Sequence, residues 1–300
     1  MRRLLCLLLV LLAFAAHGQA AVRVGSKADN EGAVLGQILL QVLRHDGVPV
    51  IDRTQLGPTS IVRRALLNGD LDVYPEYTGN AAFFFHREND PAFRDARKAY
   101  ALAASLDLAA NHLVWLMPAP ADNHWAIGVR GDMARAARLV TLDDFARWVN
   151  AGGDVFLAGS AEFVESDAAL PAFQTAYGFT LRGDQLLVLA GGDTSATIKA
   201  AAEGISGVNA SMVYSTDGAI AVTGLTVLAD PRHVEMVYQP APVVRDDVLR
   251  RYPAMRASLE AAFRPLTVEV LRKLNARTQI DGDDPAVVAR DYLRDVGRVP

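Results

Sequence analysis

Apolar and polar residues follow two alternating patterns through the first part of the chain. Short apolar runs at residues 22–26, 48–52 and 71–75 predict buried β-strands. Between them, residues 33–44 and 60–68 place apolar side chains on one helical face, and a glycine follows the second of these segments. Strands that alternate with helices at this spacing predict βαβ units on a parallel sheet.

The same pattern returns in the middle of the chain and changes in the tail. Residues 124–130 predict a strand, and Thr141 predicts the N-cap of a helix that runs to about residue 149. The tail, residues 246–298, is predicted helical, with Asp284 and Pro285 as a cap and first-turn pair. Further strands are predicted at residues 154–159, 186–190 and 210–214.

Two linker-like stretches that contain prolines divide the chain. They span residues 116–123 and 228–244. We therefore expect an α/β protein with two lobes, joined by two hinge crossings. Residues 21–122 and 228–300 together form the first lobe in this interpretation, and residues 123–227 form the second lobe.

Two segments far apart in the chain resemble each other. Residues 59–69 (TSIVRRALLNG) and 194–204 (TSATIKAAAEG) each begin with Thr-Ser and end in glycine, and a strand with a terminal tyrosine follows each, at Tyr77 and Tyr214. One explanation is that any two αβ units look alike. The other is two similar lobes that each direct a strand end at one cleft, since ligands of open α/β sheets bind beyond the carboxyl ends of strands.

The amino terminus has the pattern of an export signal. Arg2 and Arg3 precede an apolar run over residues 4–16, and small residues follow. We expect residues 1–20 to be a signal peptide that is removed, which places the protein in the periplasm. The single cysteine, Cys6, lies inside the apolar run, so the mature protein is expected to be soluble, unlipidated and without disulfides.

Charge excludes some classes of partner. The chain has 30 basic and 34 acidic residues, and removal of two arginines with the signal leaves 28 basic residues and a net charge of −6. No basic stripe indicates binding to nucleic acid or to an anionic membrane surface.

Motifs for catalysis and for cofactors are absent from the sequence. The six histidines show no metal-ligand spacing, and no phosphate loop, G-x-G-x-x-G or G-x-S-x-G motif occurs. The acidic run at residues 281–284 suggests calcium, but it lacks the spacing of an EF-hand loop and lies where a helix begins. We expect no cofactor, no metal and no enzymatic activity.

Four aromatic residues lie at strand ends or near the lobe crossings. Each alone is typical of a packed core, but together they indicate the walls of a binding cleft. They are Tyr77, Trp125, Tyr214 and Tyr238.

Several motifs resemble one family, the glycine betaine/choline (OpuAC-like) substrate-binding proteins of ABC importers for osmoprotectants. The resemblance covers essentially the whole mature chain and implies the bilobed clamp of a type II periplasmic binding protein. The motifs are GSK at 25–27, EYTGN at 76–80, NHWAI at 123–127, AEFV with LPAFQTAYGF at 161–179, VYSTDG at 213–218, YQPAPVVR at 238–245 and LNARTQIDGDDPAVVARDYL at 274–293.

The resemblance implies an aromatic cage for a quaternary ammonium group. Tyr77, Tyr214 and Tyr238 match cage positions of the family, and Trp125 stands where relatives usually carry tyrosine. A trimethylammonium group cannot donate hydrogen bonds, so aromatic faces and dispersion are what can select it.

The resemblance also implies donors for a ligand carboxylate. Lys27 of the GSK motif, Asn80 and Asn123 match such positions, with Lys27 supplying the charge; the alternative for Lys27 is an ordinary surface lysine. Where relatives read E-F-x-x-R-x-D-G, residues 162–169 read EFVESDAA, so the arginine is missing near Ser166. Its loss is expected to weaken betaine binding, which favours choline or another cation without a carboxylate, a low-affinity role for a betaine, or a ligand outside this set.

The family implies a monomeric periplasmic component of an ABC importer. It would capture a quaternary ammonium osmolyte between its lobes and deliver it to a membrane permease with its ATPase. The alternative is an exported small-amine enzyme or a ligand-sensing module, which would need a nucleophile-base pair or a metal at the cleft.

Overall fold

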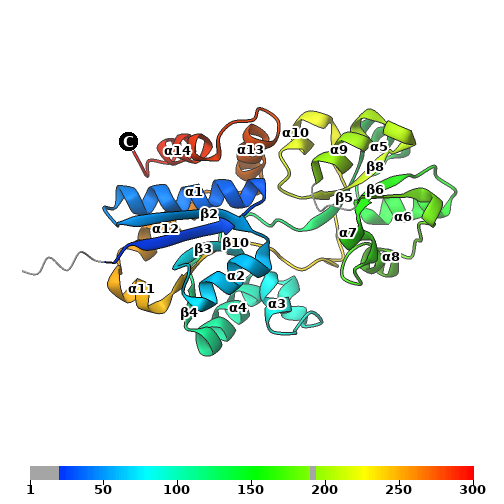
Figure 1. Cartoon of the computed structure of the whole chain (residues 1–300). Helices are drawn as coiled ribbons and strands as arrows, with labels where there is room; N and C mark the ends of the chain where they lie inside the picture. Colours follow the sequence, from blue (N-terminus) through cyan, green and yellow to red (C-terminus); the bar gives the residue numbers. More distant parts are fainter. Residues whose placement is uncertain (1–19, 190–193) are drawn as a thin grey trace, which may run out of the picture.

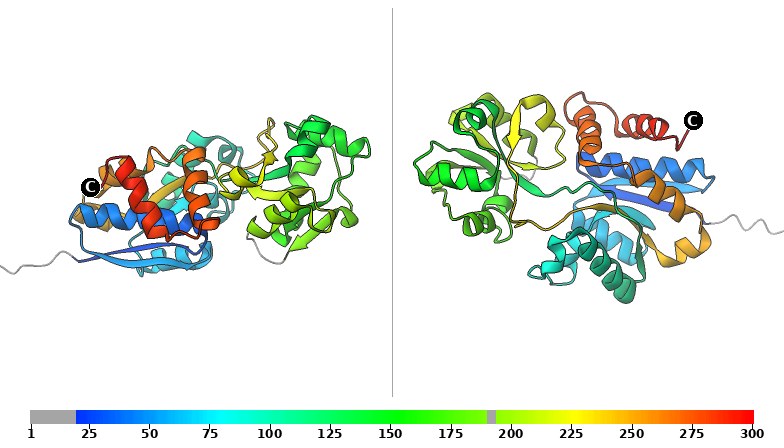
Figure 2. Two further views of the ribbon diagram at one scale, coloured as in Figure 1. Left: turned by 90° about the horizontal axis from the view of Figure 1, so that it is seen from above. Right: turned by 180° about the vertical axis from the view of Figure 1, so that it is seen from behind.

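Two α/β lobes lie side by side, and the chain passes between them twice (Figure 1). The computed structural model describes residues 20–189 and 194–300, so the predicted signal peptide lies outside the described residues except for Ala20. Both further views show the same separation into two bodies (Figure 2). No helix within the described ranges is both long enough and apolar enough to cross a membrane.

The first lobe contains a mixed five-stranded sheet with the order β2-β1-β3-β10-β4. β1 is parallel to β2 and β3, whereas β10 is antiparallel to β3 and β4. The strands are β1 (Val22–Lys27), β2 (Val50–Gly57), β3 (Val73–Tyr77), β4 (Leu113–Trp115) and β10 (Pro240–Arg245).

The second lobe repeats this plan with the order β7-β6-β8-β5-β9. β6 is parallel to β7 and β8, and β5 is antiparallel to β8 and β9. The strands are β5 (Trp125–Arg130), β6 (Leu157–Ser160), β7 (Leu186–Leu189), β8 (Ala210–Tyr214) and β9 (Leu225–Val227); the last residue of the strand predicted at 186–190 lies outside the described residues.

The predicted parallel βαβ units are confirmed for β1 to β3, but both sheets are mixed, and the two crossings supply the reason. The parallel strands of both lobes end at the cleft, where Tyr77 and Tyr214 stand. A strand that follows a crossing begins at that same edge, so it must run in the opposite direction. β5 follows the first crossing and β10 follows the second, and both are antiparallel to their neighbours.

Helices cover both faces of the first sheet. The side chains of α1 pack with those of α11 to α14 on one face, and α2 to α4 cover the other (Figure 1). The helices are α1 (Asn30–His45), α2 (Thr59–Asn68), α3 (Asn80–Phe84), α4 (Ala96–Asn111), α11 (Asp246–Arg251), α12 (Met255–Phe263), α13 (Val268–Gln279), α14 (Pro285–Asp295) and the 3-10 turn η1 (Pro91–Arg94).

The second sheet is covered in the same way, with α5 to α8 on one face and α9 with α10 on the other. The predicted N-cap of α6 is confirmed, because Thr141 Oγ1 accepts a hydrogen bond from Asp144 N at 3.2 Å. The helices are α5 (Gly131–Ala137), α6 (Leu142–Asn150), α7 (Ala161–Glu165), α8 (Leu170–Tyr177), α9 (Thr194–Glu203), α10 (Ala219–Thr223) and the 3-10 turns η2 (Gly183–Gln185) and η3 (Ile205–Gly207).

β4 and β9 are absent from the sequence-based prediction, and β2 and β10 differ from it for physical reasons. β2 continues to Gly57, beyond the predicted end. It is an edge strand whose side chains are mostly exposed, so its last residues are polar and apolar periodicity does not detect them. β10 lies inside the stretch predicted as a linker. Its Pro240 and Pro242 act as acceptors, since their carbonyls receive hydrogen bonds from the N–H groups of Ala119 (2.8 Å) and Leu116 (2.9 Å).

The two crossings are hydrogen-bonded to each other. Asn123 N donates to Tyr238 O at 3.0 Å, and Tyr238 N donates to Asp122 Oδ1 at 2.7 Å. Leu228 packs in the core of the second lobe and Met236 in the core of the first, so the chain returns between these two residues.

A third contact joins the lobes, where the loop after β8 lies against α13. Arg272 Nε donates to Ser215 O at 2.7 Å, and Gly218 N donates to Gln279 Oε1 at 2.9 Å. Gly218 comes so close that a Cβ built on it would lie 2.1 Å from Ala276 N. The loop therefore needs a glycine at this position to reach the helix.

Substitution Gly218→Ala is expected to lower the free energy of unfolding by about 1–3 kcal/mol, the usual cost of overpacking. The backbone of Gly218 has φ −65° and ψ −35°, which alanine adopts freely, so the cost comes from the clash with α13. Urea unfolding measures it, with Gly183→Ala as the control because no neighbour lies within 4 Å of a Cβ there. Equal stabilities of the two variants would contradict the close docking.

Candidate ligand-binding cleft

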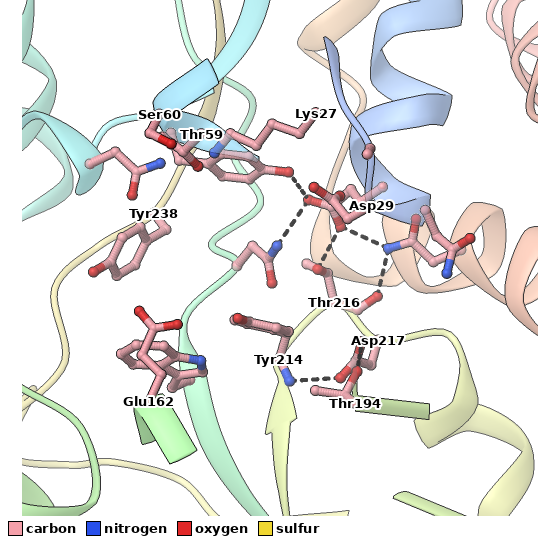
Figure 3. A pocket seen from close by; sticks show the side chains of 18 of the residues that line it. Lys27, Asp29, Thr59, Ser60, Glu162, Thr194, Tyr214, Thr216, Asp217 and Tyr238 are labelled. Carbon is pink, nitrogen blue, oxygen red and sulfur yellow. Dashed lines mark hydrogen bonds between the residues drawn. The ribbon is translucent and has the colours of Figure 1, made fainter. Parts of the chain in front are cut away.

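A cleft of about 850 Å³ lies between the lobes and receives side chains from both (Figure 3). All seven residues that the sequence singles out line it: Lys27, Tyr77, Asn80, Asn123, Trp125, Tyr214 and Tyr238. The two similar segments of the sequence thus do direct their tyrosine-bearing strands β3 and β8 at one cleft.

Trp125 and Tyr214 form one aromatic wall on the second lobe. They are opposite each other in the β5–β8 ladder, and their rings stack with centroids 6.3 Å apart and planes at 24°. Phe163 of α7 packs edge-on against Trp125 at 6.2 Å. Register and packing together fix the orientation of these two rings.

Tyr238 lies on the second crossing, and its ring faces the first lobe at Gly79. A Cβ built on Gly79 would lie 2.7 Å from two ring carbons of Tyr238. The φ of Gly79 is −64°, an ordinary value, so this glycine serves close approach and not a left-handed turn.

Lys27 is buried at the end of β1, so the alternative of a surface lysine is wrong; its exposed fraction is 7%. Its Nζ lies 2.9 Å from Glu76 Oε1 and 4.4 Å from the ring centroid of Tyr77. The fully buried Glu76 also accepts hydrogen bonds from Asn80 Nδ2 (2.7 Å) and Tyr74 OH (2.5 Å). The charge of Lys27 and the amide of Asn80 are therefore already engaged within the first lobe.

Glu31, in the first turn of α1, is the residue that the sequence-based predictions most clearly missed. Its Oε1 accepts hydrogen bonds from Tyr77 OH (2.7 Å) and Asn123 Nδ2 (3.1 Å). Its Oε2 accepts from Thr216 Oγ1 (2.6 Å) and Asn275 Nδ2 (2.7 Å). One carboxylate thus joins both lobes, the first crossing and the hydroxyl group of Tyr77.

Burial shapes the electrostatics of this group. It raises the pKa of the Glu31 carboxyl above its usual value, although the hydrogen bonds from Thr216, Tyr77 and Asn275 oppose the shift. Burial, and then the charge of Glu31, raise the pKa of Tyr77 well above 10. Burial also raises the pKa of Tyr214, to about 12. Both phenols are therefore neutral at physiological pH.

Further charged side chains line the cleft: Asp29, Arg63, Glu162 and Asp217. Arg63 forms a two-point ion pair with Asp107, one of whose hydrogen bonds measures 2.8 Å, and its guanidinium lies 4.4 Å from the Phe84 ring centroid. Among the described residues that line the cleft, both cations, Lys27 and Arg63, thus already face a carboxylate.

Two of the three aspartates in the acidic run at residues 281–284 make structural contacts. Asp283 pairs with Arg277 at 2.7 Å. Asp284 accepts a hydrogen bond from Ala286 N at 2.7 Å and precedes Pro285, which confirms the predicted cap of α14.

Substitution Glu31→Gln is expected to destabilise the folded protein by about 1–3 kcal/mol. Both oxygens of a carboxyl, protonated or ionised, can accept a hydrogen bond from the buried donors, whereas the amide N–H₂ cannot. The raised pKa means that the folded wild type holds this proton more tightly than the unfolded chain does. The resulting stability is complete below the unfolded pKa and is lost as the pH rises through the folded pKa.

The deficit of Glu31→Gln should therefore be largest below the ordinary pKa of glutamate and shrink as the pH rises in urea unfolding. The exposed Glu165→Gln variant is the control. A difference between wild type and Glu31→Gln that grows with pH would refute this description of the carboxyl.

Comparison with known proteins places the chain in a family. Residues 20–295 match the model of the substrate-binding domain of ABC-type glycine betaine transport systems. The chain is 52% identical over 292 residues to the glycine betaine-binding protein YehZ of Escherichia coli, covering 97% of this chain and 96% of that protein. It is 29% identical over 300 residues to a glycine-betaine-binding protein of Pseudomonas aeruginosa, covering 98% and 94%.

Solved structures agree with this placement. Apo YehZ from Escherichia coli superposes with a TM-score of 0.81, covering 93% of this chain and 100% of that chain. A glycine betaine/carnitine/choline ABC transporter structure, 20% identical, gives a TM-score of 0.80 over 92% and 99% of the two chains, and shows the shared fold. The chain therefore belongs to the substrate-binding proteins of ABC-type glycine betaine transport systems, with the type II periplasmic-binding-protein fold and a binding, not an enzymatic, role.

Proposed function

We propose that this protein captures a quaternary ammonium osmolyte, such as glycine betaine or choline, in the periplasm and delivers it to a membrane permease with its ATPase. The observation that carries the proposal is the convergence of four aromatic side chains on one cleft between two lobes. These side chains, called the aromatic cage below, are Tyr77, Trp125, Tyr214 and Tyr238.

The cage suits a trimethylammonium group for a simple physical reason. Such a group is cationic but has no N–H, so water and hydrogen-bonding side chains solvate it poorly. Aromatic faces attract it through their quadrupole and through dispersion, at about 0.5–2 kcal/mol for each ring once water is excluded. The names of the relatives, which include glycine betaine-binding proteins, support the same class of ligand.

The proposed polar contacts of the ligand come from Lys27, Asn80 and Asn123. Lys27 and Asn80 share Glu76, so their first effect is to hold the cage residue Tyr77 in place. A ligand carboxylate would compete with Glu76 for both of them. Asn123 stands on the first crossing, where a bound ligand would contact the hinge itself.

Delivery depends on how the lobes respond to the ligand. A ligand that contacts both lobes binds the closed form more tightly and shifts the population towards it. The permease would recognise this closed form. The predicted signal peptide and the family support a periplasmic location, and we propose that the protein acts as a monomer.

Substitution Tyr238→Leu should weaken binding of choline or glycine betaine about tenfold, because leucine fills similar space but has no aromatic face. Calorimetry and tryptophan fluorescence of the mature protein, titrated with choline, glycine betaine, carnitine and proline betaine, measure the effect. Tyr100→Leu is the matched control, because Tyr100 is half-buried in α4 and does not line the cleft. Saturable binding that both variants retain equally would remove the cage from the proposal.

A further inference from the structure

We infer that the cleft selects a monocation that carries a hydrogen-bond donor, such as a quaternary ammonium alcohol, over a zwitterionic betaine, and that Glu162 determines this choice. The inference deepens the proposed function and depends on it. The two kinds of ligand share the ammonium group and differ in the other end, which is a neutral hydroxyl in one and a carboxylate in the other.

Glu162 is held at the cleft by its neighbours. It lies in α7, directly after β6, where the N-cap Ser160 accepts a hydrogen bond from Phe163 N at 3.0 Å. Phe163 is fully buried behind the cage and packs against Trp125. Because Phe163 is anchored in this way, the preceding side chain, Glu162, lies at the cleft beside the cage.

The Glu162 side chain is exposed at the cleft, and within the described residues its carboxylate faces the cage without a partner of its own. In Figure 3, Glu162, Tyr214 and Tyr238 surround the same open space. Burial raises the pKa of both phenols. The charge of Glu162 adds to the rise at Tyr214, and at Tyr238 it adds less than the charges of Glu235 and Asp122 do. No side chain within residues 20–189 and 194–300 donates a hydrogen bond to the Glu162 carboxylate or forms an ion pair with it. A cation in the cage would therefore meet a carboxylate whose charge is unpaired.

The cationic side chains of the cleft are already committed. Lys27 is paired with Glu76 at 2.9 Å, and Arg63 forms a two-point ion pair with Asp107. Within the described part of the cleft lining, these are the two basic side chains. A ligand carboxylate would have to break one of these pairs or remain without a cation, and either outcome is unfavourable.

Two buried amide oxygens point to a ligand that donates a hydrogen bond. Glu31 fixes the Nδ2 atoms of Asn123 and Asn275, which leaves the two Oδ1 atoms as acceptors. Neither Oδ1 receives a hydrogen bond from any side chain or backbone group of the described residues, and both asparagines line the cleft. Both oxygens are shielded from solvent in this structure, so a ligand hydroxyl would satisfy them only after the two side chains shift, whereas a ligand carboxylate would be repelled by them.

One feature of the cleft favours an anion instead. The N-terminus of α2, with Thr59 and Ser60, has no side-chain cap, and a helix N-terminus attracts negative charge. These hydroxyls also fit a ligand alcohol. If a ligand carboxylate binds at this helix N-terminus, glycine betaine will bind at least as tightly as choline. The relative affinity of these two ligands therefore decides between a site for an anion and a site for an alcohol.

The experiment is calorimetry of the mature protein with choline, glycine betaine and tetramethylammonium, at low and at moderate salt. Wild type should bind choline at least fivefold more tightly than glycine betaine. Glu162→Gln should weaken choline and tetramethylammonium five- to tenfold and change glycine betaine less than twofold. Glu162→Arg should reverse the preference between choline and glycine betaine, because it supplies a cation to the carboxylate.

The matched control is Glu165→Gln, one turn further along α7, where the side chain is exposed like that of Glu162 but does not line the cleft. It tests whether a general loss of negative charge on this lobe alters binding, and it should leave all three affinities unchanged. Thermal unfolding of each variant shows whether the fold is intact.

Each outcome is informative. Tighter binding of glycine betaine than of choline by wild type, or an equal effect of Glu162→Gln on both, would overturn the inference and leave the proposed function standing. If none of the three compounds binds wild type at millimolar concentration, the proposed function fails, and the inference fails with it.

Discussion

The buried carboxylate of Glu31 is the interaction on which the geometry of the cleft depends. Its four donors come from the end of β3, the first crossing, the loop after β8 and α13. An anionic or polar group taken out of water is costly unless its hydrogen bonds are all made. All four hydrogen bonds can form only when Tyr77, the first crossing and both lobes hold the positions seen in this structure. The network therefore couples the position of the Tyr77 ring to the contact between the lobes.

Topology explains why the aromatic residues meet at all. In each lobe, the parallel strands end at the cleft and an antiparallel strand begins or returns there, because the chain crosses between lobes at that edge. Residues at strand ends on both sides of a crossing are thereby brought together, although more than a hundred positions separate Tyr77 from Tyr214. The cage needs no unusual backbone; it needs aromatic residues at these particular ends.

The sequence predicted most of this arrangement, because apolar periodicity marks buried strands and helices and the family motifs mark the strand ends. It failed where a local pattern is ambiguous. Pro240 and Pro242 resemble a linker, but they serve as acceptors in β10. Glu31 resembles any acidic residue in the first turn of a helix, and the pairing of Lys27 with Glu76 links positions 49 residues apart. Long-range partners of this kind leave no local signal in a single sequence.

The most direct test of the aromatic cage is a crystal structure of the mature protein grown with choline. The ligand nitrogen should lie within about 6 Å of the ring centroids of the cage, the usual range of cation–π contacts, with the two lobes closed around it. A structure in which choline lies outside the cleft, or in which the four rings do not contact its ammonium group, would contradict the assignment of this site.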